Sequence, residues 1–391
     1  MNKLLSPIIV ATFCFSANVV MAEDHHSDKK SFSVTDIKPG FHFLQGKGGN
    51  ILLSDGKEGL LIVDSDYSEM TPALEETLGK YEGGLKYVLN THWHGDHTQG
   101  NQALGHQADI VAHDNVYTRL NSRQEVKLFN MVSEPYEAHA LPNITFDHSL
   151  TLRFNGETIK ALHLPNGHTD GDSIIFFENA NIVHMGDHYF NGMFPFVDVG
   201  SNGSVRGVAD NIEGMLHKID DDTVVVPGHG PISNKKELMA FREMLMGTAD
   251  EVETMMGQSM TLEAIQEKGL SEQWKVWGKG FLNEKVWISI VHSSLIQDAK
   301  KQIEETKERL NHISISEKSS NGKIEVEISA ARRIKDLKID ESLMDNPEEL
   351  ADNLINVLNK ALEKADSVNE AEMKGAASGM MNMPGMDKLF K

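Results

Sequence analysis

Short apolar runs that end in polar or glycine-rich turns recur along the first part of the chain. Residues 87–91, 157–163, 181–188 and 223–230 each hold such a run, with β-branched or aromatic residues among them. Each run predicts a strand that leads into a loop. The pattern therefore places polar side chains directly after several strands.

The pattern changes towards the C-terminus. Residues 284–295 predict a helix after a Gly-Lys-Gly break, and apolar residues continue at helical spacing to Leu310. Alternating residues at 323–329 predict a strand, and 333–340 a second one. After Pro347 a long amphipathic helix follows, with an apolar face of Leu350, Leu354, Val357, Leu358, Ala361, Leu362, Ala365 and Val368.

The N-terminus predicts a secretory signal peptide. Lys3 precedes an apolar stretch that ends in Val-Met-Ala at residues 20–22, a small-residue cleavage pattern. A membrane anchor is the alternative, but the stretch is short and interrupted by Pro7. Cleavage would remove Cys14, the only cysteine, and leave no disulfide in an oxidising compartment. We expect a periplasmic or secreted protein that does not stay in the membrane.

The length of 391 residues allows two or three domains. We predict a signal peptide at 1–22 and a disordered leader at 23–31. A first domain at 32–295 and a smaller α+β domain of helix, strands and helix at 296–375 follow, and residues 376–391 form a Gly/Met-rich tail.

The segment at residues 92–97, His-Trp-His-Gly-Asp-His, packs three imidazoles and a carboxylate into six residues. His92 and His94 at alternate positions of a tight turn can converge on one ion, while Asp96 and His97 point to a second ion. Chance clustering among the 18 histidines is the alternative, but it requires too many coincidences. The turn therefore predicts a two-metal site.

Three later segments supply ligands that this turn lacks. His168 lies in a glycine-flanked loop at 164–172 and is the predicted third ligand of the first metal. Asp187 ends an apolar run, and its two carboxylate oxygens make it the predicted bridge between two cations. His229 stands between two glycines after a β-branched run, and we expect it to complete the second metal site.

With these motifs in this order, residues 32–295 resemble the metallo-β-lactamase superfamily of binuclear zinc hydrolases. The resemblance implies an α/β fold, an αββα sandwich with the metals at one edge of its two sheets, and two Zn²⁺ ions per chain. By position it implies His92, His94 and His168 as ligands of the first zinc, Asp96, His97 and His229 as ligands of the second, and Asp187 between them.

The expected chemistry is hydrolysis of a small-molecule substrate. Two Zn²⁺ ions lower the pKa of a bound water to about 7, which yields a hydroxide that attacks a carbonyl. Asp96 is the candidate catalytic residue, because it would orient this water and pass a proton to the leaving group; plain ligation is the alternative. The candidate hydrogen-bond partners of the histidine ligands are Asp64, Asp66, Asp170 and Asp172.

The substrate stays open among lactones, thioesters, amides and β-lactams, with phosphodiesters a weaker option. β-Lactamases of the superfamily carry Cys or Ser where this chain has Asp187, so the bridge resembles glyoxalase II and lactonases more closely. Residues 190–197 predict either a loop lining an apolar pocket or an ordinary buried loop. Residues 45–50 predict a hairpin turn that either moves over the site or only closes the hairpin.

Residues 296–391 resemble the YbaB/EbfC nucleoid-associated family, on the order of their elements, the Asn-Gly-Lys at 321–323 and the Met-rich tail. The resemblance implies a homodimer that binds DNA with little sequence preference. However, this region holds 15 basic and 19 acidic residues, and the whole chain has a net charge of −21. Such a charge repels DNA at long range. The local cationic patches are formed by Lys300, Lys301, Lys307, Arg309, Arg332 and Arg333.

Two functions from different classes therefore follow from the sequence. The first is a secreted zinc hydrolase, with a β-lactamase as one variant. The second is a nucleoid-associated DNA-binding protein in the cytoplasm that carries a hydrolase domain. For the C-terminal region, a dimerisation module with a solvated charged face is the alternative to DNA binding.

Overall fold

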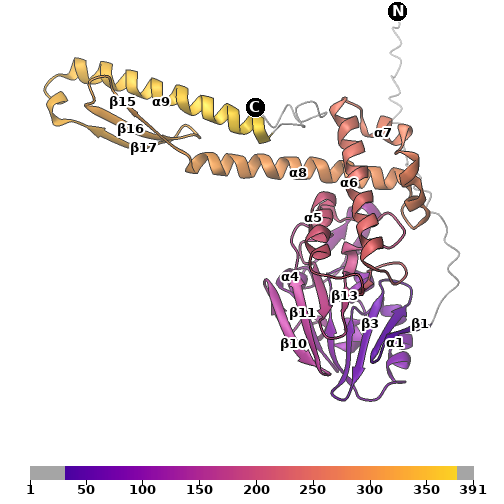
Figure 1. Cartoon of the computed structure of the whole chain (residues 1–391). Helices are drawn as coiled ribbons and strands as arrows, with labels where there is room; N and C mark the ends of the chain where they lie inside the picture. The colour runs from indigo at the N-terminus through magenta and orange to yellow at the C-terminus, as the bar shows by residue number, and fades with distance from the viewer. Residues whose placement is uncertain (1–30, 377–391) are drawn as a thin grey trace, which may run out of the picture.

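The computed structural model describes residues 31–376 (Figure 1). The predicted signal peptide, nearly all of the predicted leader and nearly all of the Gly/Met-rich tail lie outside the described residues. Within residues 31–376, none of the helices has the length and apolar character needed to cross a membrane.

The first sheet has seven strands in the order β1-β2-β3-β4-β5-β6-β9. Their bounds are Ser33–Lys38 (β1), Phe41–Gln45 (β2), Ile51–Gly56 (β3), Gly59–Val63 (β4), Leu85–Leu89 (β5), Asp109–His113 (β6) and Ile144–Phe146 (β9). The first four strands form an antiparallel meander, and β4, β5, β6 and β9 run parallel. Every residue of β4 is buried, as expected of a strand that is covered on both faces.

The second sheet has five strands in the order β10-β11-β12-β13-β14. Their bounds are Ser149–Phe154 (β10), Glu157–His163 (β11), Ser173–Phe177 (β12), Ile182–His184 (β13) and Val224–Val226 (β14). Only the pair of β13 and β14 is parallel in this sheet. These two strands therefore deliver the residues after their carboxyl ends, Asp187 and His229, to the same edge.

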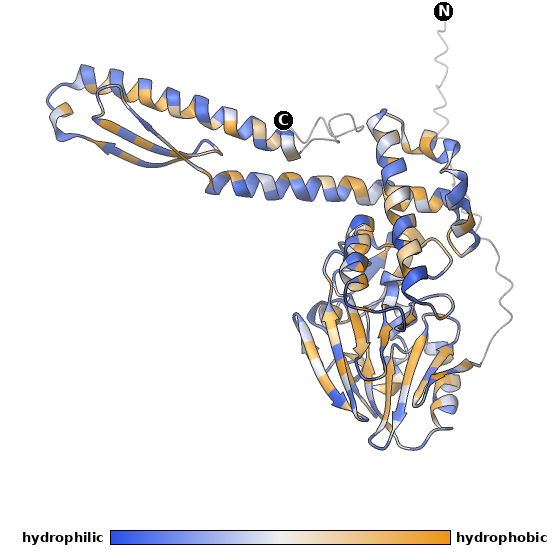
Figure 2. Cartoon of the chain, in the orientation of Figure 1, coloured by the Kyte–Doolittle hydropathy of each residue, from blue (hydrophilic) through white to orange (hydrophobic). Residues whose placement is uncertain are grey.

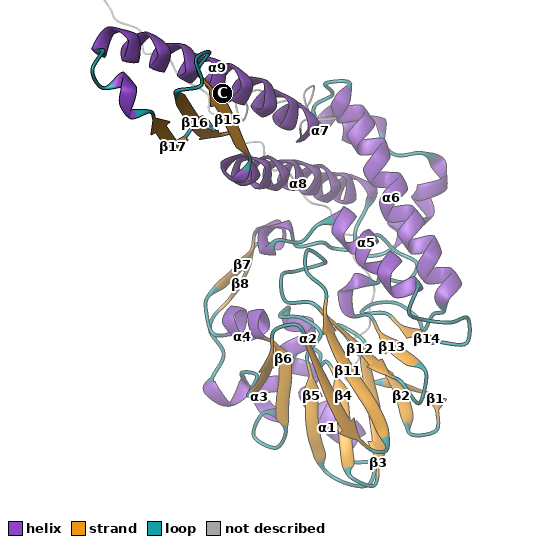
Figure 3. Ribbon diagram, turned by 60° about the vertical axis from the view of Figure 1, so that its left-hand side comes forward, coloured by secondary structure: helices purple, strands orange, loops and turns teal. Residues whose placement is uncertain are grey.

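Helices cover the outer faces of both sheets (Figure 3). The helices are α1 (Thr71–Leu78), α5 (Val205–Leu216), α6 (Lys235–Gly257) and the first half of α8 (Glu284–His312). Val63 of β4 and Phe177 of β12 share the core between the sheets, Leu74 of α1 packs on the first sheet, and Val183 of β13 packs in the cluster that holds α5, α6 and α8. The predicted αββα sandwich is therefore confirmed.

The remaining short elements connect these layers. They are α2 (Gly95–Thr98), α3 (Asn101–Leu104), α4 (Asp114–Leu120), β7 (Gln124–Val126), β8 (Met131–Ser133) and α7 (Leu262–Lys268). The pair of β7 and β8 forms a separate two-stranded hairpin.

The C-terminal part has the predicted order of helix, strands and helix. After α8 come β15 (Ser314–Lys318), β16 (Ile324–Ser329), β17 (Ile334–Ile339) and α9 (Pro347–Ala376). The three strands form an antiparallel sheet, and Val357 and Ala361 of α9 pack on Val326 and Ile328 of β16. Apolar residues are concentrated in the sheets and alternate with polar residues along α8 and α9 (Figure 2).

One strand in this part is missing from the sequence prediction. β15 has the sequence Ser-Ile-Ser-Glu-Lys, in which Ile315 is the single apolar residue. So weak an alternation does not mark a strand. Pairing with β16 stabilises it instead, because Ile315 lies opposite Ile328.

The helix α8 runs without interruption for 29 residues, so the predicted boundary between residues 295 and 296 falls inside a helix. Polar contacts with the sandwich continue beyond that point. The Ser204 hydroxyl donates to the Asp298 carboxylate (2.9 Å), and Lys301 Nζ donates to Asn166 Oδ1 (2.6 Å). Asn166 lies two residues before His168. The first part of the chain therefore depends on side chains that follow residue 295.

This arrangement predicts different stabilities for two truncated chains. A chain that ends at residue 295 lacks Asp298 and Lys301, whereas one that ends at residue 312 keeps both. Because one such hydrogen bond contributes about 1 kcal/mol, we expect the shorter chain to have a free energy of unfolding lower by about 2 kcal/mol or more. Urea unfolding followed by tryptophan fluorescence measures this difference, and equal midpoints and slopes for the two chains would contradict it.

Candidate metal centre

The histidine-rich turn begins after the carboxyl end of β5 and joins the two sheets. Thr91 is fixed on three sides: its N–H and its hydroxyl donate to the Asp64 carboxylate (both 2.8 Å), and its carbonyl accepts from the Ser173 N–H at the start of β12 (2.7 Å). The side chains of residues 92–97 therefore start from a rigid point between the sheets.

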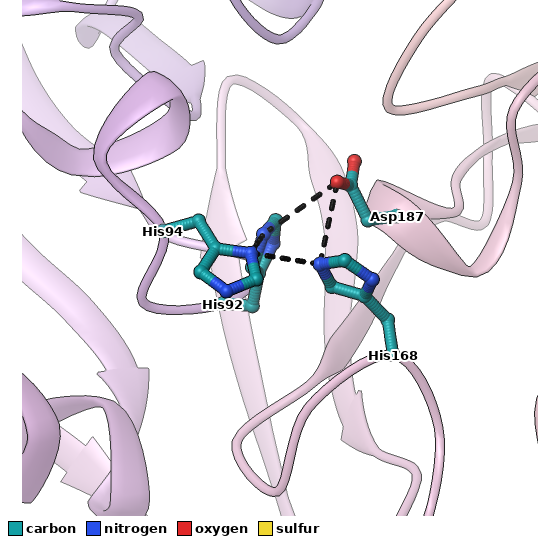
Figure 4. A group of neighbouring side chains, drawn as sticks. All are labelled: His92, His94, His168 and Asp187. Carbon is teal, nitrogen blue, oxygen red and sulfur yellow. Dashed lines mark hydrogen bonds and ion pairs between the residues drawn. The ribbon is translucent and has the colours of Figure 1, made fainter. Parts of the chain in front are cut away.

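A first cluster contains His92, His94, His168 and Asp187, all of which are buried (Figure 4). His94 Nδ1 lies 3.1 Å from His92 Nε2 and 2.8 Å from His168 Nε2. Asp187 Oδ2 lies 3.4 Å from His168 Nε2 and 3.7 Å from His92 Nε2. Ligands of a tetrahedral zinc ion are about 3.3 Å apart, which follows from a metal–nitrogen distance of about 2.0 Å. The four atoms therefore have a suitable spacing for one ion.

A second cluster contains Asp96, His97 and His229. His229 Nε2 lies 3.3 Å from His97 Nε2 and 3.2 Å from Asp96 Oδ2, and Asp96 Oδ2 lies 3.5 Å from His97 Nε2. The second oxygen of Asp187, Oδ1, lies 3.2 Å from His97 Nε2 and 3.5 Å from His229 Nε2. The structure thus brings all seven predicted ligands together in two adjacent groups.

Asp187 stands between the two groups and directs one oxygen to each. Its Oδ1 is buried and accepts no hydrogen bond within residues 31–376. A Cβ atom on Gly228 would lie 2.0 Å from this oxygen, so only glycine leaves room for the carboxylate there. An orphaned buried oxygen among imidazole nitrogens fits a cation, and the donor set of nitrogen and oxygen suits zinc.

Burial and neighbouring charges act in opposite directions on these groups. Burial raises the pKa of Asp187, but the imidazoles of His97 and His229 hold it well below its usual range. Burial lowers the pKa of His229, yet the carboxylates of Asp187 and Asp96 raise it to about 9. For His168 burial prevails, and its pKa falls to about 4. Without a cation, Asp187 is therefore ionised, His229 protonated and His168 neutral.

Second hydrogen bonds fix the histidine rings. His97 Nδ1 lies 2.7 Å from Asp64 Oδ2, His94 Nε2 lies 3.2 Å from Asp198 Oδ2, and His168 Nδ1 donates to the Phe196 carbonyl (2.8 Å). Such partners set the tautomer and orientation of a ligand. They leave the opposite nitrogen of each ring directed at its cluster.

Two family models match the chain. The model of the metallo-beta-lactamase superfamily matches residues 44–229, and that of the YbaB/EbfC DNA-binding family matches residues 293–380. The C-terminal part belongs to the YbaB/EbfC family, since a nucleoid-associated relative is 42% identical to it over 92% of that relative's length, and the first part is similar to the metallo-beta-lactamase superfamily. The chain is a metallo-beta-lactamase-fold hydrolase fused to a YbaB/EbfC-like domain, with His/Asp clusters that form a candidate metal site.

Individual relatives agree with this division. A nucleoid-associated protein of Flavobacterium johnsoniae is 42% identical over 97 residues, which are 25% of this chain and 92% of that protein. The atrochrysone carboxyl ACP thioesterase of Claviceps purpurea is 30% identical over 166 residues, 42% of this chain and 46% of that one. The chain thus spans less than half of the thioesterase.

Among solved structures, the sec-alkylsulfatase Pisa1 from Pseudomonas sp. is similar with a TM-score of 0.54 and 13% identity. The match covers 90% of this chain and 63% of that one. At this identity the likeness concerns the fold alone.

Within residues 31–376, Asp64 is the one of the four predicted partners that is hydrogen-bonded to a histidine ligand. Asp66 accepts the N–H groups of Lys47 and Gly48, Asp170 pairs with Arg119, and Asp172 accepts from Thr169. Asp198 and the carbonyl of Phe196 were not predicted. Phe196 lies in the aromatic loop at 190–197 and Asp198 directly follows this loop, and no sequence pattern there marks contact with a metal ligand.

The turn at residues 45–50 of the hydrolase part is packed against the site. The Gly49 N–H donates to the Asp96 carbonyl (3.0 Å), and the Asn50 side chain donates to the carbonyls of Pro227 and Gly230 (both 2.9 Å). A Cβ atom on Gly49 would lie 2.2 Å from the His97 ring. These contacts favour a fixed wall of the site over a turn that moves across it.

The aromatic loop at 190–197 is both buried and part of the site. Phe190 stacks on His229 with ring centres 4.7 Å apart, and Phe196 contacts His94 and His168 at 5.6 and 5.7 Å. Phe194 instead stacks on Trp287 of α8, at 5.4 Å. Phe190 and Phe196 therefore fit the expectation of a loop that lines the site, whereas Phe194 fits that of an ordinary buried loop.

The affinity for zinc should increase as the pH rises. His229 has to lose its proton before it binds a metal, and its pKa is raised to about 9. We therefore expect zinc affinity to increase from about pH 6 to about pH 8, by about tenfold per pH unit for each proton released. Calorimetric titration in two buffers of different ionisation enthalpy measures the proton release. An affinity that stays constant over this range would contradict the assignment.

Replacement of the shared carboxylate should affect both metals. We expect Asp187→Ala to lower bound zinc from about two ions to one or fewer per chain and turnover by about 100-fold or more. The control is Asp250→Ala on α6, which breaks an exposed ion pair with Arg206 of α5. Metal analysis and initial rates provide the readout, and an Asp187→Ala chain with full zinc content and full rate would show that the ligands are assigned wrongly.

Proposed function

We propose that the first part of the chain is a hydrolase that binds two Zn²⁺ ions and that Asp187 bridges them. The position of the Asp187 carboxylate carries this proposal, with Oδ2 facing His92 and His168 and Oδ1 facing His97 and His229. The remaining donors are imidazole nitrogens and the Asp96 carboxylate, a set typical of zinc sites. A separation of about 3.5–4 Å between the ions is expected for such a pair.

When bound, the two ions would lower the pKa of a water molecule and polarise a carbonyl oxygen. Asp96 is placed to act on that water, since its Oδ2 lies 3.2 Å from His229 Nε2. Burial raises the pKa of Asp96, but the neighbouring His97 and His229 hold it well below its usual range. As an ionised carboxylate, Asp96 would accept a hydrogen bond from the water, take up its proton and return it to the leaving group.

An ester, thioester or lactone is the substrate class that the site supports best, ahead of amides, β-lactams and phosphodiesters. The similar protein from Claviceps purpurea is named a thioesterase, and an Asp stands at the position where β-lactamases of the superfamily carry Cys or Ser. The residues after the bridge present no cation to a substrate carboxylate. Burial lowers the pKa of His188 to about 3, and the Tyr189 hydroxyl is hydrogen-bonded to Ser233.

For the C-terminal part, the match to the YbaB/EbfC DNA-binding family favours DNA binding, whereas the charges and the exposed apolar side chains of the described residues favour dimerisation. Four of the six candidate cations have partners in the chain: Lys301 with Asn166, Lys307 with Glu304, Arg309 with Glu372 and Arg332 with Asp366. By contrast, the edge strand β17 exposes Ile334 (56%) and Leu337 (38%). An apolar edge strand can pair with a second copy.

Two observations favour different cellular locations for the protein. The nucleoid-associated relative favours the cytoplasm. The signal peptide predicted at residues 1–22 favours the periplasm or the exterior, and it lies outside the described residues.

Zinc content and initial rates of the purified chain test the proposed hydrolase. The panel should contain a lactone, a thioester, a β-lactam and a phosphodiester, each with and without prior removal of metal by a chelator. We expect about two zinc ions per chain and turnover of the thioester or lactone that is lost on chelation and restored by zinc. A chain that binds no zinc, or turnover that survives chelation, would contradict the proposal.

A further inference from the structure

Four phenylalanines from separate parts of the sequence form a continuous series of ring contacts at the metal centre. We name Phe129, Phe190, Phe196 and Phe281 the aromatic collar. Phe190 stacks on Phe281 at 6.2 Å, Phe281 contacts Phe129 at 6.3 Å, and Phe129 contacts Phe196 at 4.8 Å. The series therefore includes residues from three separate segments of the chain.

Both ends of this series rest on predicted metal ligands. Phe190 lies 4.7 Å from His229 of the second cluster, and Phe196 lies 5.6 Å from His94 of the first. The aromatic collar thus connects the two clusters through apolar rings. A substrate whose reacting carbonyl lies between the clusters would have these rings as its immediate neighbours.

The aromatic collar lies on the side of the centre that is open to solvent. The side chains of His229 and Asp96 are 22% and 18% exposed, whereas those of His92, His97, His168 and Asp187 are at most 4% exposed. Phe190, which is itself buried, stacks on the accessible His229, and Phe281 beyond it is 43% exposed.

Further exposed apolar side chains lie next to Phe129 in the chain. Leu128 and Phe129 lie between β7 and β8, and Met131 and Val132 belong to β8. The exposed fractions of Leu128, Met131 and Val132 are 42%, 44% and 48%. Apolar side chains exposed together beside a reaction centre are typical of a site that binds an apolar ligand.

We propose that the aromatic collar binds the apolar acyl chain of the substrate and makes the enzyme selective for long-chain acyl esters and thioesters. This inference rests on the proposed hydrolase function and specifies its substrate. In the reaction, the oxygen of water bonds to the acyl carbon while the carbon–oxygen or carbon–sulfur bond breaks. The products are a fatty acid and an alcohol or thiol that receives the proton.

A series of p-nitrophenyl esters tests the selectivity with the zinc-loaded full chain. Burial of additional methylene groups should raise kcat/KM for the octanoate ester above that for the acetate ester by about tenfold or more. Phe281→Ala and Phe129→Ala should each lower this ratio by about threefold or more. Phe281→Leu, which keeps an apolar side chain, should retain most of the selectivity.

Tyr117→Ala provides a matched control. Tyr117 is an aromatic residue of α4 with 38% exposure, close to that of Phe281, and it takes no part in the aromatic collar. We expect its replacement to leave the octanoate to acetate ratio unchanged. If the octanoate to acetate ratio is the same in the unmodified chain, in Phe281→Ala and in Phe129→Ala, the inference is overturned.

Binding of metal-directed inhibitors separates this inference from the proposed hydrolase. We expect octanohydroxamate to bind the zinc-loaded chain about tenfold or more tightly than acetohydroxamate, with the difference reduced in Phe281→Ala. If this difference is found and no ester is hydrolysed, the aromatic collar stands and the hydrolase proposal fails. If esters are hydrolysed and both hydroxamates bind equally, the hydrolase stands and the inference on the acyl chain fails.

Discussion

The geometry of the centre depends on one buried carboxylate, that of Asp187, which is divided between two groups of imidazoles. An ionised carboxylate away from water costs several kcal/mol unless opposite charge and hydrogen bonds compensate for it. Here His97 and His229 face one oxygen and His92 and His168 face the other. The positive charge of His97 and His229, whose pKa values are raised, or the charge of a bound cation in its place, offsets the cost. The surrounding fold holds this one side chain in place.

Residues of both sheets fix the positions of the Asp187 carboxylate and of the histidines around it. Asp187 follows β13 and His229 follows β14, and the parallel pairing of these strands fixes the distance between them. The Gly228 N–H donates to the Gly186 carbonyl (2.8 Å), which ties the two strand ends together. On the other side Asp64 holds both Thr91 and His97. It does so with φ at 66°, a conformation that residues other than glycine rarely adopt. Such strain is common at functional sites.

Much of this arrangement could be predicted from the sequence, because each predicted ligand stands directly after a strand or in a glycine-flanked loop. Local patterns of this kind identified all seven residues that the structure brings together, and the resemblance to the metallo-β-lactamase superfamily implied the αββα layers. Contacts between distant segments could not be predicted in the same way. Asp198 reaches His94 across 104 residues, and the aromatic collar combines residues from 129 to 281. No periodicity links such positions.

Helical spacing was recognised on both sides of residue 295, but local patterns did not show that α8 continues unbroken across the predicted domain boundary. The change of composition near residue 295 is real, but a helix continues across it, because Ala299 and Ile303 stay buried in the same cluster as Trp287. Lys301 contacts the loop that carries His168 through Asn166. The parts of the chain that match the two families are therefore joined by one continuous helix, α8, and not by a flexible linker. Through Lys301, the C-terminal part contacts the loop that carries the predicted ligand His168.

The distance between the metals tests the central claim most directly. X-ray absorption spectroscopy at the zinc edge on the zinc-loaded chain would show a zinc–zinc vector of about 3.5–4 Å, with a first shell of nitrogen and oxygen only. The account predicts that this vector is present and is absent from Asp187→Ala. Isolated zinc ions without such a vector, or a vector that persists without the Asp187 carboxylate, would contradict it.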